Sequence, residues 1–310
     1  MKHVEVIANS GSADNISAIA ARPWWLVIAP VLFLLLWAGG YAVAKVGLAY
    51  SPPMTLLVLR YTCVVVLMAI LFIFIRPKLP QTGKDWAHVA IVGILMQSVY
   101  FGMCWMAFIN GVAAGTAALI MSLQPILVAI IAPRWTGEHV SIRQWVGLAL
   151  ALLGTVLVIV VRLDVGSASA TGLLLAGLAL VGITFATLWE KRFGVTHHPV
   201  TTNLIGYAAG LVGVLPFMFW LETPEIEWTW SFAAALAYLV IGNSLIAVGL
   251  LLAMIRAGEV SKVSALMFLI PPLAALIAWF GLGEVMPPLA WLGLALAGVG
   301  VFIAMRKSKP

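Results

Sequence analysis

The sequence contains the same stretch twice, first from Pro125 to Gly154 and again from Pro271 to Gly300. Laid over each other without a gap, the two copies agree at about half of their positions, which chance does not explain. The same spacing pairs further residues upstream, namely Lys45 with Lys191, Tyr61 with Tyr207, and Gln97-Ser98 with Asn243-Ser244. The whole chain is therefore one unit written twice.

Composition decides the environment of this repeated unit. Of the 310 residues, 63% are hydrophobic and only 9% are charged, and the mean hydropathy is +1.10. A soluble fold with this composition would lack the polar residues to cover its surface. The two cysteines, Cys63 and Cys104, lie inside apolar runs and suggest neither a disulfide framework nor a metal site. We therefore expect an all-α integral membrane protein.

Ten apolar runs are long enough for a helix to cross roughly 30 Å of hydrocarbon. They lie at about residues 25–46, 53–75, 86–108, 113–132, 142–161, 171–192, 200–221, 231–254, 260–279 and 288–305. The expected organisation is a disordered tail over 1–23, one five-helix repeat over 24–165, a second over 166–306, and a short tail over 307–310. Residues 1–22 lack the cationic start and cleavage site of a signal peptide.

The charged residues set the expected orientation. With a cytoplasmic N-terminus, all of the 17 Lys and Arg residues except Lys45, Arg60 and Arg162 fall in cytoplasmic segments, as the positive-inside rule requires. Both termini then face the cytoplasm. Because five helices are an odd number, the second repeat must cross the membrane upside down, which makes the two halves inverted repeats. Such repeats are typical of secondary transporters, whose substrate site lies near the midplane between the halves.

Several motifs resemble a known family. Trp37-Ala38-Gly39-Gly40 through Lys45, then Pro52-Pro53 and Arg60, is similar to the opening two helices of the EamA branch of the drug/metabolite transporter superfamily. The two copies of the repeated stretch, with Pro125 or Pro271, a Gly-Glu pair and a Trp-x-Gly helix, resemble that family's repeat signature. The resemblance implies a ten-helix transporter of small organic metabolites, and more narrowly a bacterial inner-membrane exporter of amino acids, particularly aromatic ones and methionine. The chain departs from the family pattern at His139 and Val285, where an Arg is usual, so no role is expected for a charge there.

The first expected helix carries a candidate binding face. Trp37, Tyr41 and Lys45 are four residues apart and share one face of the helix. Two aromatic rings and a cation could bind the side chain and the carboxylate of an amino acid. Alternatively, the rings pack against another helix and Lys45 extends to the outer interface.

Arg60 is the second candidate. It follows Pro53 by seven residues, and so lies about 10 Å inside the second expected helix. A guanidinium facing lipid there would cost roughly 2.5 to 3.5 kcal/mol, so Arg60 should face the interior. It would either hold an anionic group of the substrate or tether backbone carbonyls.

Gln97 and Asn243 are the third candidate, because the repeat places these amides at equivalent mid-membrane positions together with Ser98 and Ser244. They could bind the amino group and the carboxylate of a substrate near the pseudo-twofold axis. Hydrogen bonds between helices are the alternative.

The remaining candidates are aromatic residues, a charge and prolines. Tyr100, Trp105 and Trp189 could line a cavity, although aromatic residues in membrane helices often only pack. Lys191, the repeat mate of Lys45, could close the cytoplasmic mouth or simply be a solvated helix end. Pro125, Pro271 and Pro272 interrupt the fourth and ninth expected helices at matching depths and could serve as hinges or as static kinks.

Some functions lack their residues in this sequence. Every Asp and Glu falls in a loop, in the tail or at a helix end, and no metal-binding spacing or catalytic triad occurs. We therefore expect no enzyme activity, cofactor or metal, and no obligatory proton coupling. The basic residues are scattered and do not suggest nucleic-acid binding. The expected partners are a small-molecule substrate and the lipid bilayer, with the protein acting as a monomer. A multidrug exporter of the same fold, a channel and a membrane enzyme are the alternatives.

Overall fold

The computed structural model describes residues 25–135, 141–163, 169–194, 197–250, 254, 269–283 and 285–305. These residues form helices joined by short connections and contain no strand. The first helices are α1 (Trp25–Leu48), α2 (Pro53–Ile75), α3 (Gly83–Gly93), η1 (Ile94–Phe101), α4 (Gly102–Ile109), α5 (Ala114–Met121), α6 (Gln124–Trp135) and α7 (Ile142–Leu163). The remaining ones are α8 (Ala170–Phe193), α9 (Pro199–Leu221), α10 (Trp230–Ala237), η2 (Tyr238–Ala247), α13 (Ile270–Leu282) and α14 (Pro288–Met305).

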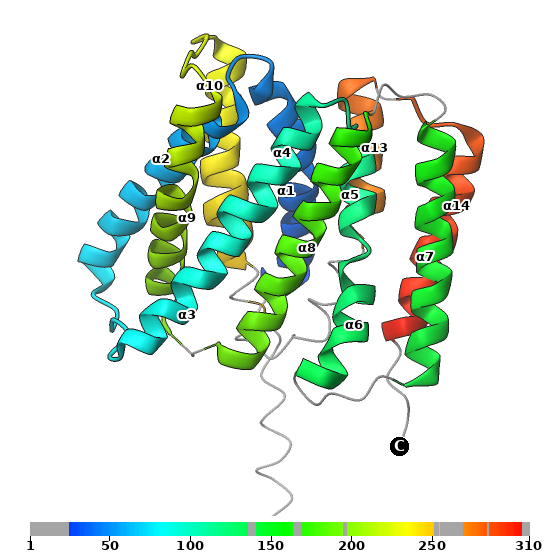
Figure 1. Ribbon diagram of the computed structural model, residues 1–310, viewed down its shortest axis with the longest axis horizontal. Coiled ribbons are helices and arrows are strands. Elements are labelled where there is room, and N and C mark those ends of the chain that lie inside the picture. The colour runs from blue at the N-terminus through cyan, green and yellow to red at the C-terminus, as the bar shows by residue number, and fades with distance from the viewer. Residues whose placement is uncertain are drawn as a thin grey trace, which may run out of the picture.

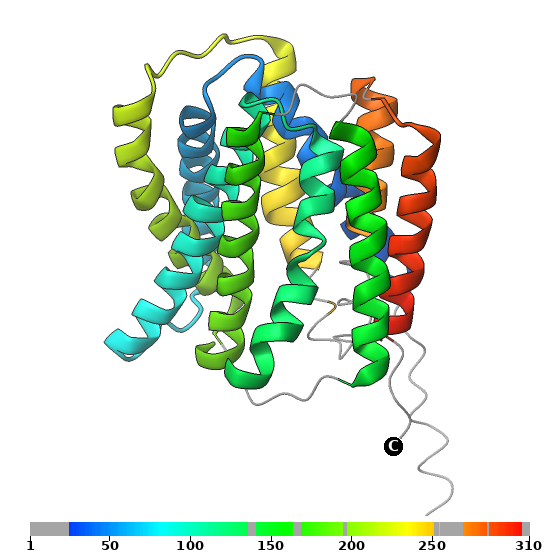
Figure 2. The ribbon, with the colours of Figure 1, turned by 45° about the vertical axis from the view of Figure 1, so that its right-hand side comes forward.

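The helices run side by side and form a bundle (Figures 1 and 2). Six of the described helical spans are long and apolar enough to cross a membrane by length and composition, and many large apolar side chains face outward. The fold is therefore that of a multi-pass membrane protein built from two repeats, as the sequence predicts. The expected tails (1–23 and 307–310) and the first half of the ninth expected span lie outside the described residues.

The third and eighth expected spans are not uniform α-helices. In both of them an α-helix passes into a π-helix, η1 in the first repeat and η2 in the second. The Ser244 hydroxyl donates to the carbonyl of Leu239, five residues earlier, within η2. These π-helices carry the repeat-related pairs Gln97-Ser98 and Asn243-Ser244. Wider helical turns of this kind are rare and occur frequently at functional sites.

The fourth expected span is broken into α5 and α6. The break is a turn at Ser122 and Leu123, directly before the first turn of α6, which contains Pro125. Proline has no N–H to donate to the carbonyl four residues earlier and its ring crowds that carbonyl, so an uninterrupted helix is disfavoured there. Pro271 and Pro272 likewise lie in the first turn of α13.

Repeat-related helices pack directly against each other and run antiparallel. A Cβ added to Gly154 would lie 2.4 Å from the backbone nitrogen of Ala297, whereas one added to Gly147 would lie 2.3 Å from that of Ala304. A later residue of α7 therefore contacts an earlier residue of α14, so the two helices run in opposite directions. Figures 1 and 2 both show the two helices side by side.

The helices α2 and α9 form the second such pair. The ring of Tyr61 lies 5.5 Å from that of its repeat mate Tyr207. At one end of the pair the carboxylate of Glu222 accepts hydrogen bonds from the backbone N–H groups of Met54 and Thr55 (2.8 and 2.9 Å). The repeat-related helices α2 and α9 therefore contact each other through Tyr61 and Tyr207 and are also joined at one end by Glu222.

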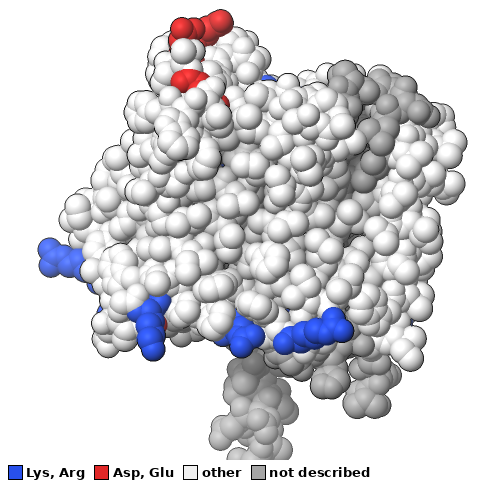
Figure 3. All heavy atoms as spheres, in the orientation of Figure 1, with Lys and Arg blue, Asp and Glu red and all other residues white. Residues whose placement is uncertain are grey.

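The charges separate between the two ends of the bundle. Figure 3 shows most of the visible Lys and Arg side chains towards the lower edge and the largest group of acidic side chains at the upper end. The upper connection between α9 and α10 carries Glu222, Glu225 and Glu227, and the N–H of Glu227 donates to the carbonyl of Tyr50. This connection therefore crosses over the turn between α1 and α2.

Candidate functional site

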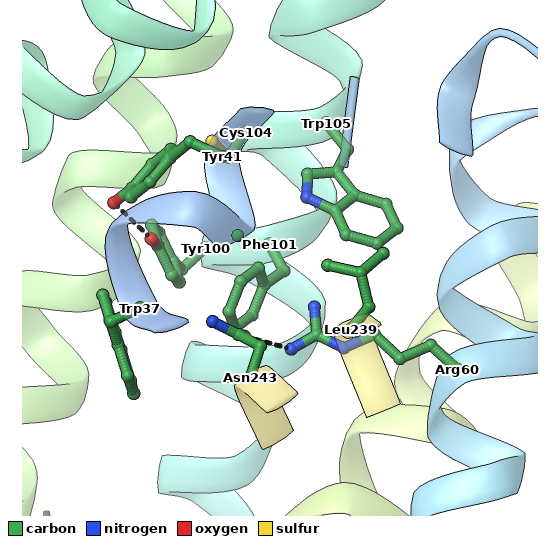
Figure 4. Close-up of a pocket in the computed structure, with 10 residues that line it drawn as sticks. Trp37, Tyr41, Arg60, Tyr100, Phe101, Cys104, Trp105, Leu239 and Asn243 are labelled. Carbon is green, nitrogen blue, oxygen red and sulfur yellow. Dashed lines mark hydrogen bonds between the residues drawn. The ribbon is translucent and has the colours of Figure 1, made fainter. Parts of the chain in front are cut away.

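A pocket in the interior of the bundle brings together side chains from both repeats (Figure 4). The empty space between these side chains is about 330 Å³, open solvent included. The lining residues come from α1, α2, η1, α4 and η2: Trp37, Gly40, Tyr41, Arg60, Tyr100, Phe101, Cys104, Trp105, Leu239 and Asn243. None of them is an Asp or a Glu, so the fixed charge of the pocket wall comes from Arg60.

Arg60 is almost completely buried, with 1% of its surface exposed. Its Nη2 donates to Oδ1 of Asn243 (2.8 Å) and to Oγ of Ser244 (3.0 Å), and its Nε donates to the same Ser244 oxygen (3.2 Å). Arg60 belongs to the first repeat and both of its acceptors to the second. It therefore faces the interior, as the sequence predicts, and it joins the two halves.

Aromatic rings surround the guanidinium. Its central carbon lies 4.7 Å from the ring centre of Phe101, 5.7 Å from that of Trp105 and 5.9 Å from that of Tyr61. Cation–π attraction at such distances stabilises the charge away from water. The remaining guanidinium nitrogen, Nη1, is buried and has no hydrogen-bond partner. The pocket therefore presents a cation with unused donor capacity beside aromatic rings.

The opposite wall of the pocket is formed by Trp37, Tyr41 and Tyr100. The hydroxyl groups of Tyr41 and Tyr100 lie 2.9 Å apart and share a hydrogen bond between α1 and η1. Trp37 stacks obliquely on Phe33 along α1, with ring centres 5.5 Å apart. The structure therefore assembles six of the predicted binding residues around one space: Trp37, Tyr41, Arg60, Tyr100, Trp105 and Asn243.

Gln97 does not line this pocket, although it is the repeat mate of Asn243. Its side chain packs against α9, where a Cβ added to Gly210 would lie 2.3 Å from the Cβ of Gln97. Its Oε1 is buried without a hydrogen-bond partner, while its carbonyl accepts from the hydroxyl of Tyr61 (2.7 Å). The two amides thus have different surroundings.

The two repeats also differ at the position of Arg60, whose mate is Gly206. At Gly206 the backbones of α9 and α3 touch, since a Cβ added to Gly93 would lie 2.5 Å from the Gly206 carbonyl oxygen. One half of the molecule therefore has a charged pocket where the other has close backbone packing.

Lys45, Lys191 and Trp189 lie away from the pocket. The two lysines are in the last turns of α1 and α8. Trp189 lies in α8 next to Phe193, with ring centres 4.8 Å apart, and faces His88 of α3 at 6.0 Å. The His88 ring stacks on Phe193 at 5.0 Å. Trp189 thus belongs to an aromatic cluster between α3 and α8.

Four of the pocket residues are not among the predicted binding residues. Phe101 follows Tyr100 and could have been found from its place in the aromatic run, and Gly40 from its place beside Tyr41. Cys104 is buried and Leu239 belongs to η2; nothing in the sequence distinguishes them from other apolar residues. Within the described part of the chain, no group of three potential metal ligands comes together.

Comparisons with known proteins follow the same division into halves. Residues 24–160 and 170–306 each match the model of the EamA-like transporter family. A probable terminal-alkyne amino-acid exporter of Streptantibioticus cattleyicolor is 27% identical over 286 residues, which cover 91% of this chain and 94% of that protein. The uncharacterized transporter YvbV of Bacillus subtilis is 25% identical over 279 residues, covering 89% and 90%. A crystal structure with 20% sequence identity covers 90% of this chain and 96% of its own with a TM-score of 0.64, which supports the fold.

Proposed function

Because the chain belongs to the EamA-like transporter family, we propose that it exports amino acids, with aromatic amino acids and methionine as its preferred substrates. Its activity is the transport of a small molecule across a membrane and not catalysis. We assign it to the bacterial inner membrane with both termini in the cytoplasm, since most of the described Lys and Arg residues lie at one end of the bundle (Figure 3).

The observation that carries this proposal is the pairing of Arg60 with aromatic rings inside the bilayer. A buried guanidinium is costly in a membrane and usually marks a substrate pathway. Its free Nη1 is a donor for a carboxylate, to which Arg binds strongly and with defined geometry. The rings of Trp37, Phe101 and Trp105 offer apolar faces for an aromatic or thioether side chain.

Alternating access is the mechanism that we propose for this site. The pocket contains residues of both repeats, and Arg60 of the first repeat bonds to η2 of the second. A rocking motion of one repeat against the other would therefore change the surroundings of a bound substrate. Pro125, which follows the break between α5 and α6, and Pro271 and Pro272 in the first turn of α13 are candidate hinges for such a motion.

A multidrug exporter is the alternative function. Many drugs that such exporters carry are cations, and they would need a carboxylate as counter-charge. The pocket offers Arg60 and no acidic side chain. Its charge therefore suits zwitterions and anions better than cations.

Counterflow in proteoliposomes tests the proposal. Liposomes that contain the purified protein and a high internal concentration of L-tryptophan, L-phenylalanine or L-methionine should accumulate the same labelled amino acid from outside. Protein-free liposomes should not. If none of the three amino acids exchanges while the protein is folded, the proposed substrate class is wrong.

The same preparation tests the coupling of transport to protons. No Asp or Glu is among the buried side chains of the described residues, so no acidic proton carrier is evident there. We expect counterflow to continue after an ionophore collapses the proton gradient. Concentrative uptake that requires this gradient would instead show proton coupling.

A further inference from the structure

The partners of Arg60 are uncharged, although carboxylates are the usual partners of a buried arginine. Its acceptors are the amide oxygen of Asn243 and the hydroxyl oxygen of Ser244. Neutral acceptors satisfy the geometry of the guanidinium and leave its positive charge uncancelled. In a pocket of low dielectric such a charge acts strongly on whatever binds there.

Both acceptors are held in one orientation. The Asn243 amide nitrogen donates to the carbonyl of Leu36 on α1 (3.2 Å), which turns its oxygen towards Arg60 (Figure 4). The Ser244 hydroxyl donates to the Leu239 carbonyl (2.9 Å) and so presents its lone pairs to Arg60. These contacts fix two guanidinium nitrogens, Nη2 and Nε.

Gly40 allows this arrangement. A Cβ at this position would lie 2.7 Å from the Asn243 amide nitrogen, too close for an undisturbed side chain. Without a side chain, α1 and η2 come close enough for the amide to reach the Leu36 carbonyl. The sequence therefore provides both the neutral acceptor and the space that it needs.

The third guanidinium nitrogen, Nη1, has no acceptor among the side chains around it. Nη1 is buried and unpaired, and leaving a buried donor without an acceptor costs free energy. A carboxylate at Nη1 would satisfy the donor and neutralise the charge at once. An uncharged carboxamide in the same place would accept a hydrogen bond but would not neutralise the charge.

We propose that Asn243 determines substrate specificity as a positioning residue: it orients Arg60 without cancelling its charge, so that the pocket selects ligands with a free carboxylate. This inference rests on the proposed function and adds the chemical basis of its selectivity. It also assigns Asn243 a role through Arg60 in place of direct contact with the substrate.

The substitution Asn243→Asp tests this inference. The new carboxylate would occupy the position of the amide oxygen, stay ionised beside Arg60 and cancel its charge. In counterflow experiments the wild-type protein should prefer L-tryptophan to L-tryptophanamide, in which a carboxamide replaces the carboxylate. The variant should reduce this preference about tenfold to a hundredfold. L-Phenylalanine and L-methionine with their amides serve as parallel pairs.

One further variant controls for the chemical change from Asn to Asp, and another replaces Asn243→Asp if that variant does not fold. Asn110→Asp makes the same chemical change at the end of α4, where the Asn110 side chain bonds to the Met106 carbonyl, away from Arg60. It should keep the wild-type preference. If Asn243→Asp is not monodisperse in detergent, Ser244→Asp places a carboxylate at the other acceptor position of Arg60 and should have the same effect.

Each outcome separates the inference from the proposed function. If the wild-type protein exchanges an amino acid and the folded Asn243→Asp variant keeps the full preference for the carboxylate, the inference is wrong and the proposed function stands. A wild-type protein that exchanges acids and amides equally, or a folded variant that exchanges neither, also overturns the inference alone. If the wild-type protein exchanges no amino acid, both fall.

Discussion

Arg60 is a residue whose place in the membrane demands an explanation. The free energy to bury an arginine among apolar helices is offset here by three hydrogen bonds and by the faces of Tyr61, Phe101 and Trp105. None of these contacts requires a carboxylate. The residue is stabilised and yet remains charged, which is what a binding site for anions needs.

Substitution of Arg60 should therefore affect binding of the substrate more than folding. We expect Arg60→Lys to raise the KM for amino-acid counterflow about tenfold, and Arg60→Ala up to about a hundredfold, because a hydrogen bond to a charged group contributes about 1.5 to 3 kcal/mol. Arg76→Lys, at the exposed end of the same helix, is the matched control and should leave the KM unchanged. An unchanged KM in Arg60→Ala would remove this residue from the site.

The bond between the hydroxyl groups of Tyr41 and Tyr100 should contribute to stability. Each single change to Phe leaves the other buried hydroxyl without its partner, at a cost of about 1 to 3 kcal/mol. The double variant loses both groups and should be destabilised by less than the sum of the single changes. Unfolding free energies of the four proteins in detergent would measure this coupling; strict additivity would show that the bond contributes nothing.

Sequence reasoning at the residue scale succeeded where position alone restricts a side chain. A lone arginine about 10 Å inside a membrane helix has to face inward, and Trp37 and Tyr41 share a helical face because they are four residues apart. The repeat made Gln97 and Asn243 equivalent, but their packing partners differ: Gly210 for one and Gly40 for the other. The repeat therefore predicts that two paired residues lie at a similar depth in the membrane, but it does not predict which side chains surround each of them.

At the scale of elements, the helices α7 and α14 depend on small residues. Without a hydrophobic effect between helices in lipid, association rests on close packing. Gly147, Gly154 and Gly300 bring the backbones together. A methyl group at any of these positions would collide with backbone atoms, which cannot move aside as a flexible side chain can.

Two glycines of α14 provide a matched test of this packing. A Cβ at Gly300 would lie 2.3 Å from the Ala151 nitrogen, whereas a Cβ at Gly298 would meet nothing within 4 Å. We expect Gly300→Ala to lower the unfolding free energy by about 1 to 3 kcal/mol, and Gly298→Ala to leave it unchanged or raise it slightly. Thermal unfolding in detergent would compare them, and equal effects would contradict the close contact between α7 and α14.

Most helices could be predicted from the length of their apolar runs, and their ends agree within a few residues with the structure. Two features could not. Hydropathy does not distinguish a π-helix from an α-helix, so η1 and η2 were not expected. An interruption of the fourth span near Pro125 was expected. The sequence did not indicate that this span would form two separate helices, α5 and α6, with a turn at Ser122 and Leu123 between them.

At the scale of the whole molecule, the separation of charges indicates how the bundle sits in the membrane. Glu222, Glu225 and Glu227 lie at one end, and the opposite end carries most of the described Lys and Arg residues (Figure 3). From the positive-inside rule we propose that the basic end faces the cytoplasm.

Cysteine labelling tests this orientation. The labelled variants carry Cys63→Ala and Cys104→Ala. A cysteine in place of Glu225 should react with a membrane-impermeant maleimide in cells with an intact inner membrane whose outer face the reagent can reach. A cysteine at Gln81, in the exposed connection between α2 and α3, should react only after the membrane is permeabilised. The opposite pattern would invert the assigned topology.

The contrast between Arg60 and its mate Gly206 has a consequence for how such a protein can evolve. An ancestor with identical halves would have carried two arginines, which repel each other in a medium of low dielectric, or two glycines and no charge. The two halves therefore differ at this position, with Arg60 in one and Gly206 in the other. A chimaera made by fusing two copies of the first half would place an arginine at the position of Gly206, beside Gly93 of α3, and should therefore carry two like charges inside the bundle, which repel each other.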